Sequence, residues 1–334
     1  MLIYAGSTAG GEGISILSAD SDGSLTPIGA PVRVASPTLL IAHHSLPVLY
    51  AVNTVADGAV CALGIDDVGG LVPFSQQPSG GVRPLHAAVT EDGRYLICAH
   101  LGEAGAVAVL PLRADGSLEP PCHVTFPSDT KRAIAHHISI RGEEVAVACL
   151  GLGELRGYRI ADEGTLALAW TAPAAHPAVG PRHVARHPNG TWFVSDEMAS
   201  TVSIYRPDPA NGGVRLAGST PATRTEPSPD DPNRPSEIAI SDDGRFVYVA
   251  NRSADTIAVF AVNQASLAFI GESPTGGVRP RHFALAGSRL YVANERSDEI
   301  TMLTINPQTG MVDNPRVAAT VAKPTCVLLR GRQV

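Results

Sequence analysis

Short apolar runs alternate with polar turns along the whole chain. The stretch 236–260 reads SEIAIS, DDGR, FVYVAN, RSAD and TIAVF, which predicts two strands around a tight turn and then a third strand. The Asp-Gly pair stands where a hairpin turn needs positive φ angles. Closely similar text recurs at 181–205 and at 280–303. The chain therefore repeats one antiparallel unit.

The repeat can be measured from the residue that follows each second strand. These residues are Thr54, Leu101, Leu150, Glu197, Arg252 and Glu295, and successive ones lie 43 to 55 residues apart. A looser fourth strand follows each third one, and four strands in such a period are typical of a β-propeller blade. The longest step contains TRTEPSPDDPNRP at 223–235, whose Pro and Asp residues predict a rim loop.

The two ends of the chain complement one another. Six units occupy residues 33 to 319; the head supplies a unit without its first strand, and KPTCVLLRG at 323–331 supplies a first strand alone. Joining them completes a seventh blade and closes the ring without an exposed sheet edge. The sequence thus predicts an all-β fold, a seven-bladed β-propeller with four antiparallel strands per blade, in one domain spanning 1–334.

Composition narrows the choice of partners and compartment. The 334 residues carry a formal net charge of −7, which argues against general affinity for nucleic acid or membranes. No apolar run has the length of a transmembrane helix, and the N-terminus lacks a signal-peptide pattern. The five cysteines show no CxxC spacing, and Cys61, Cys98 and Cys149 lie in apolar runs, which predicts reduced core thiols in a cytoplasmic protein. We expect a monomer or a weak homodimer.

Charged residues recur at one end of the predicted hairpins. The start of the first strand and the end of the second lie opposite the turn, and in a propeller the first strands line the central channel. Charges at these positions should therefore converge on one mouth of the channel. The repeat predicts three pairs: Arg182 with Glu197, Glu237 with Arg252, and Arg281 with Glu295. Each pair could instead be a structural ion pair that ties blades together.

Histidines occupy similar positions in two earlier units. His86 and His136 both stand near the start of a first strand. Because side chains alternate along a strand, only one of His136 and His137 is expected to face the channel; His136 shares its side with Ile138. A glutamate between two arginines should keep a lowered pKa and stay ionised. No nucleophile elbow, phosphate-binding loop or metal-ligand spacing appears, so we expect no cofactor and no metal.

At these residues the sequence resembles the lactonase family of seven-bladed propellers, which includes bacterial 6-phosphogluconolactonase and the fungal carboxy-cis,cis-muconate cyclising enzyme. The matching text is GPRHVARHPNG…DEMASTVSIY, SEIAISDDGRFVYVANRSADTIAVF and GGVRPRHFAL…LYVANERSD. The resemblance implies that Arg182, Glu197 and Arg252 are active-site residues and that His136 is the catalytic histidine. Asp196 stands where the family usually has Asn.

The resemblance implies a lactonase that hydrolyses a sugar-acid lactone, first of all 6-phosphogluconolactone to 6-phosphogluconate. We expect Arg182 and Arg252 to bind the substrate's anionic groups and stabilise the oxyanion, with Arg252 on the remote anion. Glu197 or His136 would accept a proton from water, and the residues expected to contact substrate are His86, Glu237 and Arg281. A muconate-type cycloisomerase and a non-catalytic binding scaffold are the alternatives.

Overall fold

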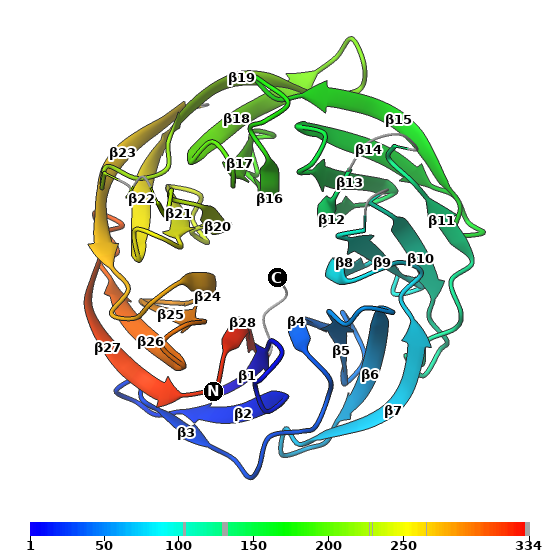
Figure 1. Cartoon of the computed structure of the whole chain (residues 1–334), viewed down its shortest axis with the longest axis horizontal. Coiled ribbons are helices and arrows are strands. Elements are labelled where there is room, and N and C mark those ends of the chain that lie inside the picture. The colour runs from blue at the N-terminus through cyan, green and yellow to red at the C-terminus, as the bar shows by residue number, and fades with distance from the viewer. Residues whose placement is uncertain (103–104, 129–132, 227, 229, 265, 331–334) are drawn as a thin grey trace.

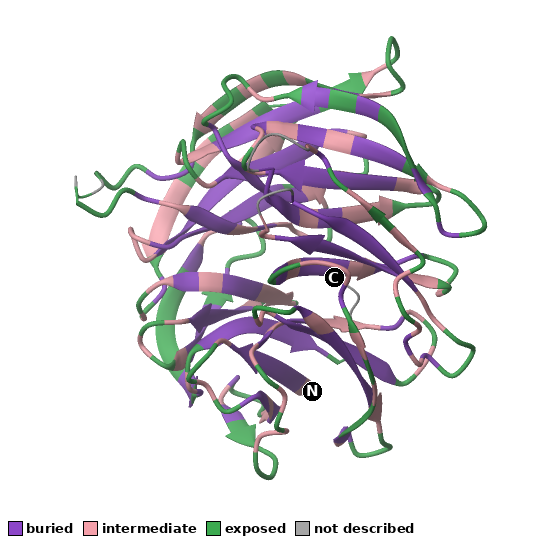
Figure 2. Ribbon diagram, turned by 45° about the vertical axis from the view of Figure 1, so that its right-hand side comes forward, coloured by how far each residue is buried: buried purple, intermediate pink, exposed green. Residues whose placement is uncertain are grey.

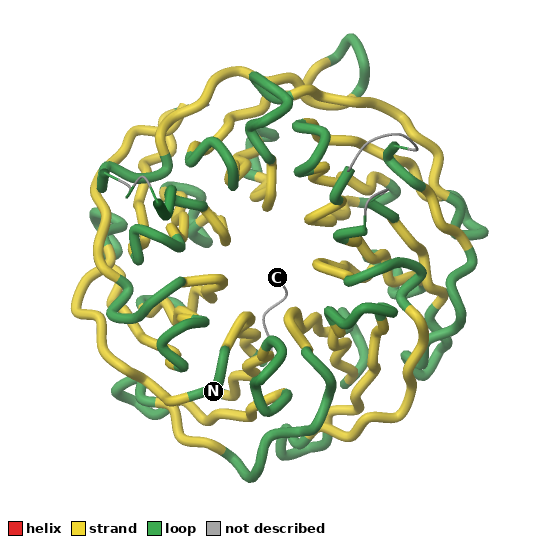
Figure 3. The backbone as a smooth tube through the Cα atoms, in the orientation of Figure 1, coloured by secondary structure: helices red, strands yellow, loops and turns green. Residues whose placement is uncertain are grey.

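The computed structural model describes residues 1–102, 105–128, 133–226, 228, 230–264 and 266–330. Seven four-stranded antiparallel sheets stand around a central channel, as Figure 1 shows. The described residues contain strands, turns and loops and no helix (Figure 3). The predicted all-β, seven-bladed propeller is therefore confirmed.

Each of the first six blades is a run of four consecutive strands, ordered from the channel outwards. Blades 1 to 3 comprise β4 (Pro37–Ala42), β5 (Val48–Asn53), β6 (Ala59–Ile65) and β7 (Leu71–Pro78); β8 (Pro84–Val89), β9 (Tyr95–His100), β10 (Val107–Pro111) and β11 (His123–Thr125); and β12 (Ala135–Arg141), β13 (Glu144–Cys149), β14 (Glu154–Ile160) and β15 (Leu166–Pro173). Blades 4 to 6 comprise β16 (Pro181–Arg186), β17 (Trp192–Asp196), β18 (Thr201–Asp208) and β19 (Gly213–Pro221); β20 (Pro235–Ile240), β21 (Phe246–Asn251), β22 (Thr256–Asn263) and β23 (Ser266–Pro274); and β24 (Pro280–Ala286), β25 (Arg289–Asn294), β26 (Glu299–Ile305) and β27 (Val312–Thr320).

The closing blade combines the two ends of the chain. It is ordered β28 (Pro324–Leu329), β1 (Leu2–Ser7), β2 (Ile14–Ala19) and β3 (Leu25–Pro27). β28 pairs antiparallel with β1, with Tyr4 opposite Leu328. The last strand thus becomes the innermost strand of the blade that the first strands begin, which confirms the predicted closure.

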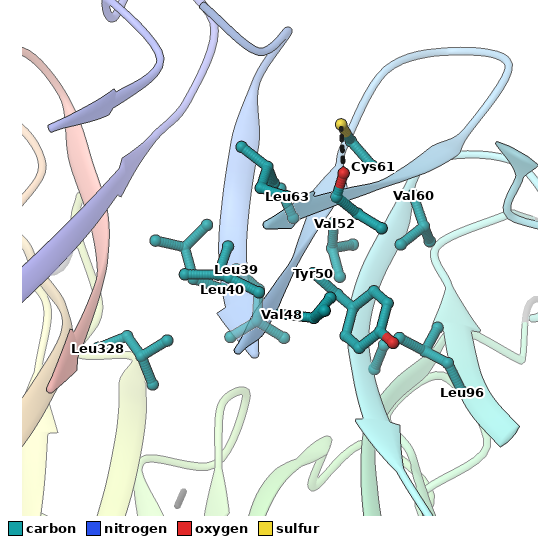
Figure 4. Close-up of a cluster of buried hydrophobic side chains, with 14 of the residues drawn as sticks. Leu39, Leu40, Val48, Tyr50, Val52, Val60, Cys61, Leu63, Leu96 and Leu328 are labelled. Atoms are coloured by element: carbon teal, nitrogen blue, oxygen red, sulfur yellow. Dashed lines mark hydrogen bonds between the residues drawn. The ribbon is translucent and has the colours of Figure 1, made fainter. Parts of the chain in front are cut away.

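Apolar side chains pack between neighbouring blades rather than around one common centre. Figure 2 shows buried positions along the inner strands and exposed positions mainly in turns and outermost strands. Figure 4 shows one such layer, where Leu328 of the closing blade, Leu40 and Tyr50 of blade 1 and Leu96 of blade 2 are all essentially excluded from water. Burying one leucine of this kind stabilises the fold by about 1.5–3 kcal/mol.

Tyrosine hydroxyls add polar links between blades. A buried tyrosine in the second strand donates a hydrogen bond to a glycine carbonyl in the outer hairpin turn of the next blade, which satisfies a phenol that would otherwise be buried unpaired. Three links of this kind are Tyr4 to Gly69 at 3.0 Å, Tyr50 to Gly116 at 2.9 Å and Tyr291 to Gly23 at 3.2 Å.

The five cysteines form no disulfide, and Cys61, Cys98 and Cys149 lie in the core as predicted. The 223–235 segment, predicted as a rim loop, connects β19 to β20 where it is described. A search of the described residues for helices long and apolar enough to cross a membrane finds none.

Removing residues 320–334 should open the ring. The deletion takes away β28, exposes the inner edge of β1 and uncovers the apolar layers on both sides of the closing blade. We expect loss of the cooperative thermal transition, measured by circular dichroism and calorimetry. A chain shortened only by residues 331–334 is the control. An unchanged thermal midpoint in the larger deletion would rule out closure by β28.

Candidate active site

The first strand of every blade contains a β-bulge close to its start. In β16, Pro181 pairs with Asp196 and His183 pairs with Ser195, so Arg182 is the extra residue. The same register shift occurs in the first strands of the other six blades. A bulge re-aims side chains that would otherwise alternate. Two consecutive residues of each first strand can therefore face the channel.

We say that the extra residue holds the outer position of its strand, because it lies nearer the strand's start at the channel mouth. The next residue along the strand holds the inner position. The outer positions are held by Thr38, Leu85, His136, Arg182, Ser236, Arg281 and Thr325. The inner positions are held by Leu39, His86, His137, His183, Glu237, His282 and Cys326.

Backbone hydrogen bonds place the ends of the second strands beside these positions. The N–H of Glu197 donates to the carbonyl of Gly180 at 2.8 Å, and the N–H of Glu295 donates to that of Arg279 at 3.1 Å. The equivalent bond from Arg252 to Arg234 measures 3.2 Å. The charged residues of blades 4 to 6 thus lie at one end of the ring, as the sequence predicted.

The bulge overturns the predicted placement of two histidines. His86 was matched with His136, but it shares the inner position with His137. His137 was expected to point away from the channel, yet its ring centroid lies 4.1 Å from that of His86 and 4.7 Å from that of His183. His136 lies 5.3 Å from His183 by the same measure. Both members of the pair therefore belong to the channel cluster.

The predicted pair of Glu237 with Arg252 was also wrong. Glu237 holds an inner position, and its outer neighbour in the same blade is the uncharged Ser236. One carboxylate oxygen lies 3.1 Å from His183 Nδ1 and the other lies 3.3 Å from His282 Nε2. Glu237 therefore bridges the inner histidines of blades 4 and 6 instead of neutralising an arginine.

The predicted pair of Arg182 with Glu197 does form, and Arg252 joins it. Glu197 Oε2 lies 3.0 Å from Arg182 Nε and 2.9 Å from Arg252 Nη2. The side chains of the two arginines are only 4% and 5% exposed, and that of Glu197 is 14% exposed. One carboxylate thus compensates two buried guanidinium groups from adjacent blades, which is required because an unpaired buried charge is costly.

This environment determines the charges of the three groups. Burial by itself would raise the pKa of Glu197, but attraction to Arg182 and Arg252 outweighs it and lowers the pKa, as predicted. Burial and repulsion from Arg252 lower the pKa of Arg182 to about 9. The site therefore holds an ionised glutamate and two charged arginines at neutral pH.

The channel histidines are neutral under the same conditions. Burial is the main cause of a lowered pKa for His86, His136, His137, His183 and His282. The charge of Arg182 lowers the pKa of His136 further. A neutral imidazole has one nitrogen able to accept a hydrogen bond, so His136 can act as a base without first losing a proton.

The third predicted pair, Arg281 with Glu295, is present and has an additional partner. Glu295 Oε2 lies 3.4 Å from Arg281 Nη1 and 3.4 Å from Arg279 Nε. Arg279 is the residue directly before β24, a position that the sequence analysis did not consider. Two Arg–Glu–Arg sets, one deeply buried and one partly exposed, therefore stand at the same mouth.

A polar cavity lies among the outer and inner positions. Its volume is ≈ 30 Å³, enough to hold at least one water molecule. Its polar lining includes His86, His136, Arg182, His183, Arg281 and His282, and its apolar lining is Leu39 and Leu85.

Two buried polar atoms at this cavity have no hydrogen-bond partner in the described part of the chain. They are His136 Nδ1 and Arg182 Nη1. Buried polar groups are nearly always hydrogen-bonded, so a pair of unsatisfied atoms in one polar cavity indicates a binding position for a polar group. A histidine and an arginine, each with one unpartnered buried nitrogen, thus line the same small cavity.

A larger surface hollow of ≈ 340 Å³ lies between residues 8–12 and 33–36. Its charged lining consists of Glu12 and Arg33, and it contains no histidine. The hollow thus lacks a histidine beside an arginine, whereas the smaller cavity has both. The smaller cavity is therefore the candidate active site. Among the described residues, no group of His, Cys, Asp or Glu side chains is arranged to hold a metal ion.

Asp196, immediately before Glu197, is a buried acid with incomplete pairing. Its Oδ2 accepts hydrogen bonds from Thr201 at 2.8 Å and Ser203 at 2.6 Å, while Oδ1 lacks a partner among the described residues. Burial raises the pKa of Asp196 to about 7 even though both hydroxyls oppose the shift. The equivalent positions of three other blades carry the neutral Asn53, Asn251 and Asn294, matched by their register.

Sequence reasoning missed His183, His282 and Arg279. The text PRH at 181–183 and again at 280–282, beside PLH at 84–86, was a signal for the inner histidines. Reading only one channel-facing residue per strand assigned the arginines of these motifs and passed over the histidines. The text GGVRP, at 80–84 and again at 276–280, was a comparable signal for Arg279, which corresponds to Arg83.

Comparison with known proteins agrees with this architecture. Residues 2–329 match the family model described as "Lactonase, 7-bladed beta-propeller". The chain belongs to this lactonase family. A curated relative, the 6-phosphogluconolactonase of Bacillus subtilis, is 29% identical and the match covers 97% of each chain.

Solved structures resemble this lactonase-family chain over nearly its full length. The periplasmic gluconolactonase PpgL of Pseudomonas aeruginosa has a TM-score of 0.88 and 26% identity, with 98% of both chains covered. A protein from Lactobacillus plantarum has a TM-score of 0.89 and 25% identity, with 98% of this chain and 99% of that chain covered. The Bacillus subtilis relative is thus named for a phosphorylated lactone, and the Pseudomonas aeruginosa protein is named for an unphosphorylated one.

Asp196→Asn should stabilise this propeller at alkaline pH. The folded-state pKa of about 7 lies above the unfolded value, so the folded state binds the proton more tightly and Asp196 costs stability increasingly as pH rises toward 7. Asparagine cannot ionise. We expect a higher thermal midpoint than wild type at about pH 8 and a smaller difference at about pH 5. An equal difference at both pH values would contradict the assignment.

Proposed function

We propose that this lactonase-family propeller hydrolyses a sugar-acid lactone at the mouth of its channel, with 6-phosphogluconolactone as the leading substrate. The observation that supports this most directly is the juxtaposition of unpartnered His136 Nδ1 and Arg182 Nη1 in one polar cavity. Lactone hydrolysis needs a base for the attacking water and a cationic group for the oxygen that becomes negative.

His136 is the proposed base. It is neutral, it lines the cavity, and its Nδ1 has no partner among the described residues. A water bound there would lose a proton to the imidazole as its oxygen attacks the lactone carbonyl carbon. The same proton could then pass to the ring oxygen that leaves as a hydroxyl. Positioned acid–base catalysis of this kind contributes a factor of about 10²–10⁴ in rate.

Arg182 is the proposed oxyanion-binding residue. Glu197 holds its Nε, so the guanidinium plane is oriented before substrate arrives, while Nη1 keeps a donor available in the cavity. Such donors are effective because they are already in place when charge develops, in a site that excludes bulk water. Arg252 shares the same carboxylate oxygen and helps to keep Arg182 in position.

Glu197 fits the role of an orienting anion better than that of the base. Both arginines approach its Oε2, so this oxygen is already occupied by two cationic donors, whereas His136 Nδ1 has no partner among the described residues. His86 and Glu237 hold inner positions and would support the site from there. Glu237 contacts His183, whose ring lies beside that of His136, and so helps to keep these rings in place. We further propose a cytoplasmic location, in keeping with five free cysteines.

The direct test is an assay of purified protein against 6-phosphogluconolactone, unphosphorylated gluconolactone and carboxymuconate. Hydrolysis of either lactone faster than the uncatalysed reaction supports the proposal. Exclusive turnover of carboxymuconate would replace it with the cycloisomerase alternative. Absence of turnover with all three compounds would favour a binding scaffold.

His136→Gln should lower kcat on the best lactone by about 10²–10⁴, because the substitution keeps size and polarity but removes the base. The matched control is His123→Gln, on the outermost strand of blade 2, for which we expect wild-type kinetics. Circular dichroism and thermal unfolding establish that both variants are folded. A folded His136→Gln enzyme with wild-type kcat would exclude His136 as the base.

The activity should persist at mildly acidic pH. Both His136 and Glu197 have lowered pKa values, so the protonated forms that would block the mechanism appear only at lower pH than usual. We expect kcat to stay level from about pH 8 to about pH 5.5, past the value near 6.5 where an ordinary histidine titrates. A loss of half the activity near pH 6.5 would be inconsistent with this scheme.

A further inference from the structure

The partly exposed Arg–Glu–Arg set offers a second function at the channel mouth, and the inference drawn from it rests on the proposed lactonase activity. Arg279 and Arg281 approach the same Glu295 oxygen at 3.4 Å each. In the buried set, Arg182 and Arg252 approach Glu197 at 3.0 and 2.9 Å. The Glu295 contacts are long for charge-assisted hydrogen bonds, so this pairing is the looser of the two.

Exposure separates the two sets in the same way. The side chains of Arg279, Arg281 and Glu295 are 20%, 26% and 18% exposed, compared with 4% and 5% for the buried arginines. A soluble anion can therefore reach Arg279 and Arg281 without opening the fold. Water also weakens their attraction to Glu295, so exchanging this carboxylate for a stronger anion is feasible.

The partly exposed Arg–Glu–Arg set borders the reaction cavity through Arg281. Arg281 occupies the outer position of blade 6, as Arg182 does in blade 4, and both line the cavity with His136. The charge of Arg281 also contributes to the shifted pKa values of Arg182 and Glu197. A group held by Arg281 would therefore belong to the same ligand whose carbonyl lies at Arg182.

The backbone holds Arg279 in place at this border. Its N–H donates to Asp255 Oδ1 at 2.6 Å, and its carbonyl accepts from the N–H of Glu295 at 3.1 Å. Its φ of 63° is in the left-handed region, where blade 4 has Gly180 with φ of 70°. The equivalent residues Ser36, Arg83, Ile134 and Lys323 also have positive φ, so this conformation belongs to the propeller repeat and fixes the backbone that leads into the first strand.

We propose that Arg279 and Arg281 form a subsite for the phosphate group of a phosphorylated sugar lactone, and that Glu295 occupies this subsite until the phosphate displaces it. A phosphate dianion offers more charge and more acceptor oxygens than one carboxylate, and two arginine forks match its geometry. An unphosphorylated lactone leaves the contacts of Glu295 intact. The subsite therefore determines preference for the phosphate without being needed for ring opening.

The same geometry assigns the substrate's remote anionic group to Arg279 and Arg281 rather than to Arg252. Arg252 is buried and already shares Glu197 with Arg182, so binding a second anion there would disturb the group that orients the oxyanion donor. Arg279 and Arg281 do not contact Glu197 and so do not orient Arg182 through it. Anion recognition and bond cleavage are then divided between the two Arg–Glu–Arg sets.

The test compares two lactones in two variants. Arg279→Gln and Arg281→Gln should each reduce kcat/KM for 6-phosphogluconolactone on the order of tenfold to a hundredfold, mostly through KM, because each removes charge-assisted contacts to phosphate. For unphosphorylated gluconolactone we expect kcat/KM of Arg279→Gln, whose residue does not line the cavity, to stay within about threefold of wild type. The control is Arg245→Gln, whose exposed side chain lies in the hairpin turn of blade 5, where it pairs with Asp243.

Glu295→Gln provides a change in the opposite direction. Removing the competing carboxylate should strengthen inhibition by inorganic phosphate several-fold and lower KM for the phosphorylated lactone. A purely structural role of Glu295 predicts weaker binding or lower stability instead. Weaker phosphate inhibition in a folded Glu295→Gln protein would overturn the displacement model.

Phosphate binding measured by calorimetry separates this inference from the proposed function. If no lactone is hydrolysed but wild type binds inorganic phosphate and the Arg279→Gln/Arg281→Gln double variant does not, the subsite stands and the lactonase proposal fails. If both lactones are hydrolysed and the variants affect them equally, or affect neither, the lactonase proposal stands and the subsite is wrong. Arg281→Lys, which keeps the charge, serves if the glutamine variants do not fold.

Discussion

One extra residue near the start of each first strand determines what the channel can contain. A regular strand would direct alternate side chains to the two neighbouring blades and leave at most one residue per blade at the mouth. The bulge at Arg182, and at its six equivalents, allows two consecutive side chains to approach the channel. The outer and inner layers of the site, and therefore the meeting of arginines above histidines, follow from this local mismatch between paired strands.

Sharing of carboxylates between blades makes such a dense cluster of cations tolerable. Glu197 compensates Arg182 from its own blade and Arg252 from the next. Glu237 in turn contacts histidines from the blades on either side of its own. No single blade could satisfy these groups, so the site depends on the closed ring. Removing one partner would leave another charge buried without compensation, which is costly.

The stability needed to hold this cluster comes from outside the channel. Apolar layers between blades and tyrosine-to-glycine hydrogen bonds join each sheet to the next. The channel itself contains groups that lower the stability of the fold. These are the unpartnered atoms of His136 and Arg182 and the buried acid Asp196. Incomplete pairing in the midst of a well-packed fold is the arrangement expected where a ligand supplies the missing partners. Related propellers are named for both phosphorylated and unphosphorylated lactones.

The strands, the blades, the closure of the ring and the pairs of Arg182 with Glu197 and Arg281 with Glu295 could all be predicted from the amino-acid sequence. These features depend on alternation, on turn residues and on counting along one hairpin, all of which are local properties of the text. The three-dimensional structure was needed to show that His137 belongs to the channel, that Glu237 contacts His183 and His282, and that Arg279 pairs with Glu295. A bulge is a mismatch between two strands and cannot be read from either one alone. Contacts across blades depend on the curvature of the ring, which brings together residues that no spacing along the chain relates.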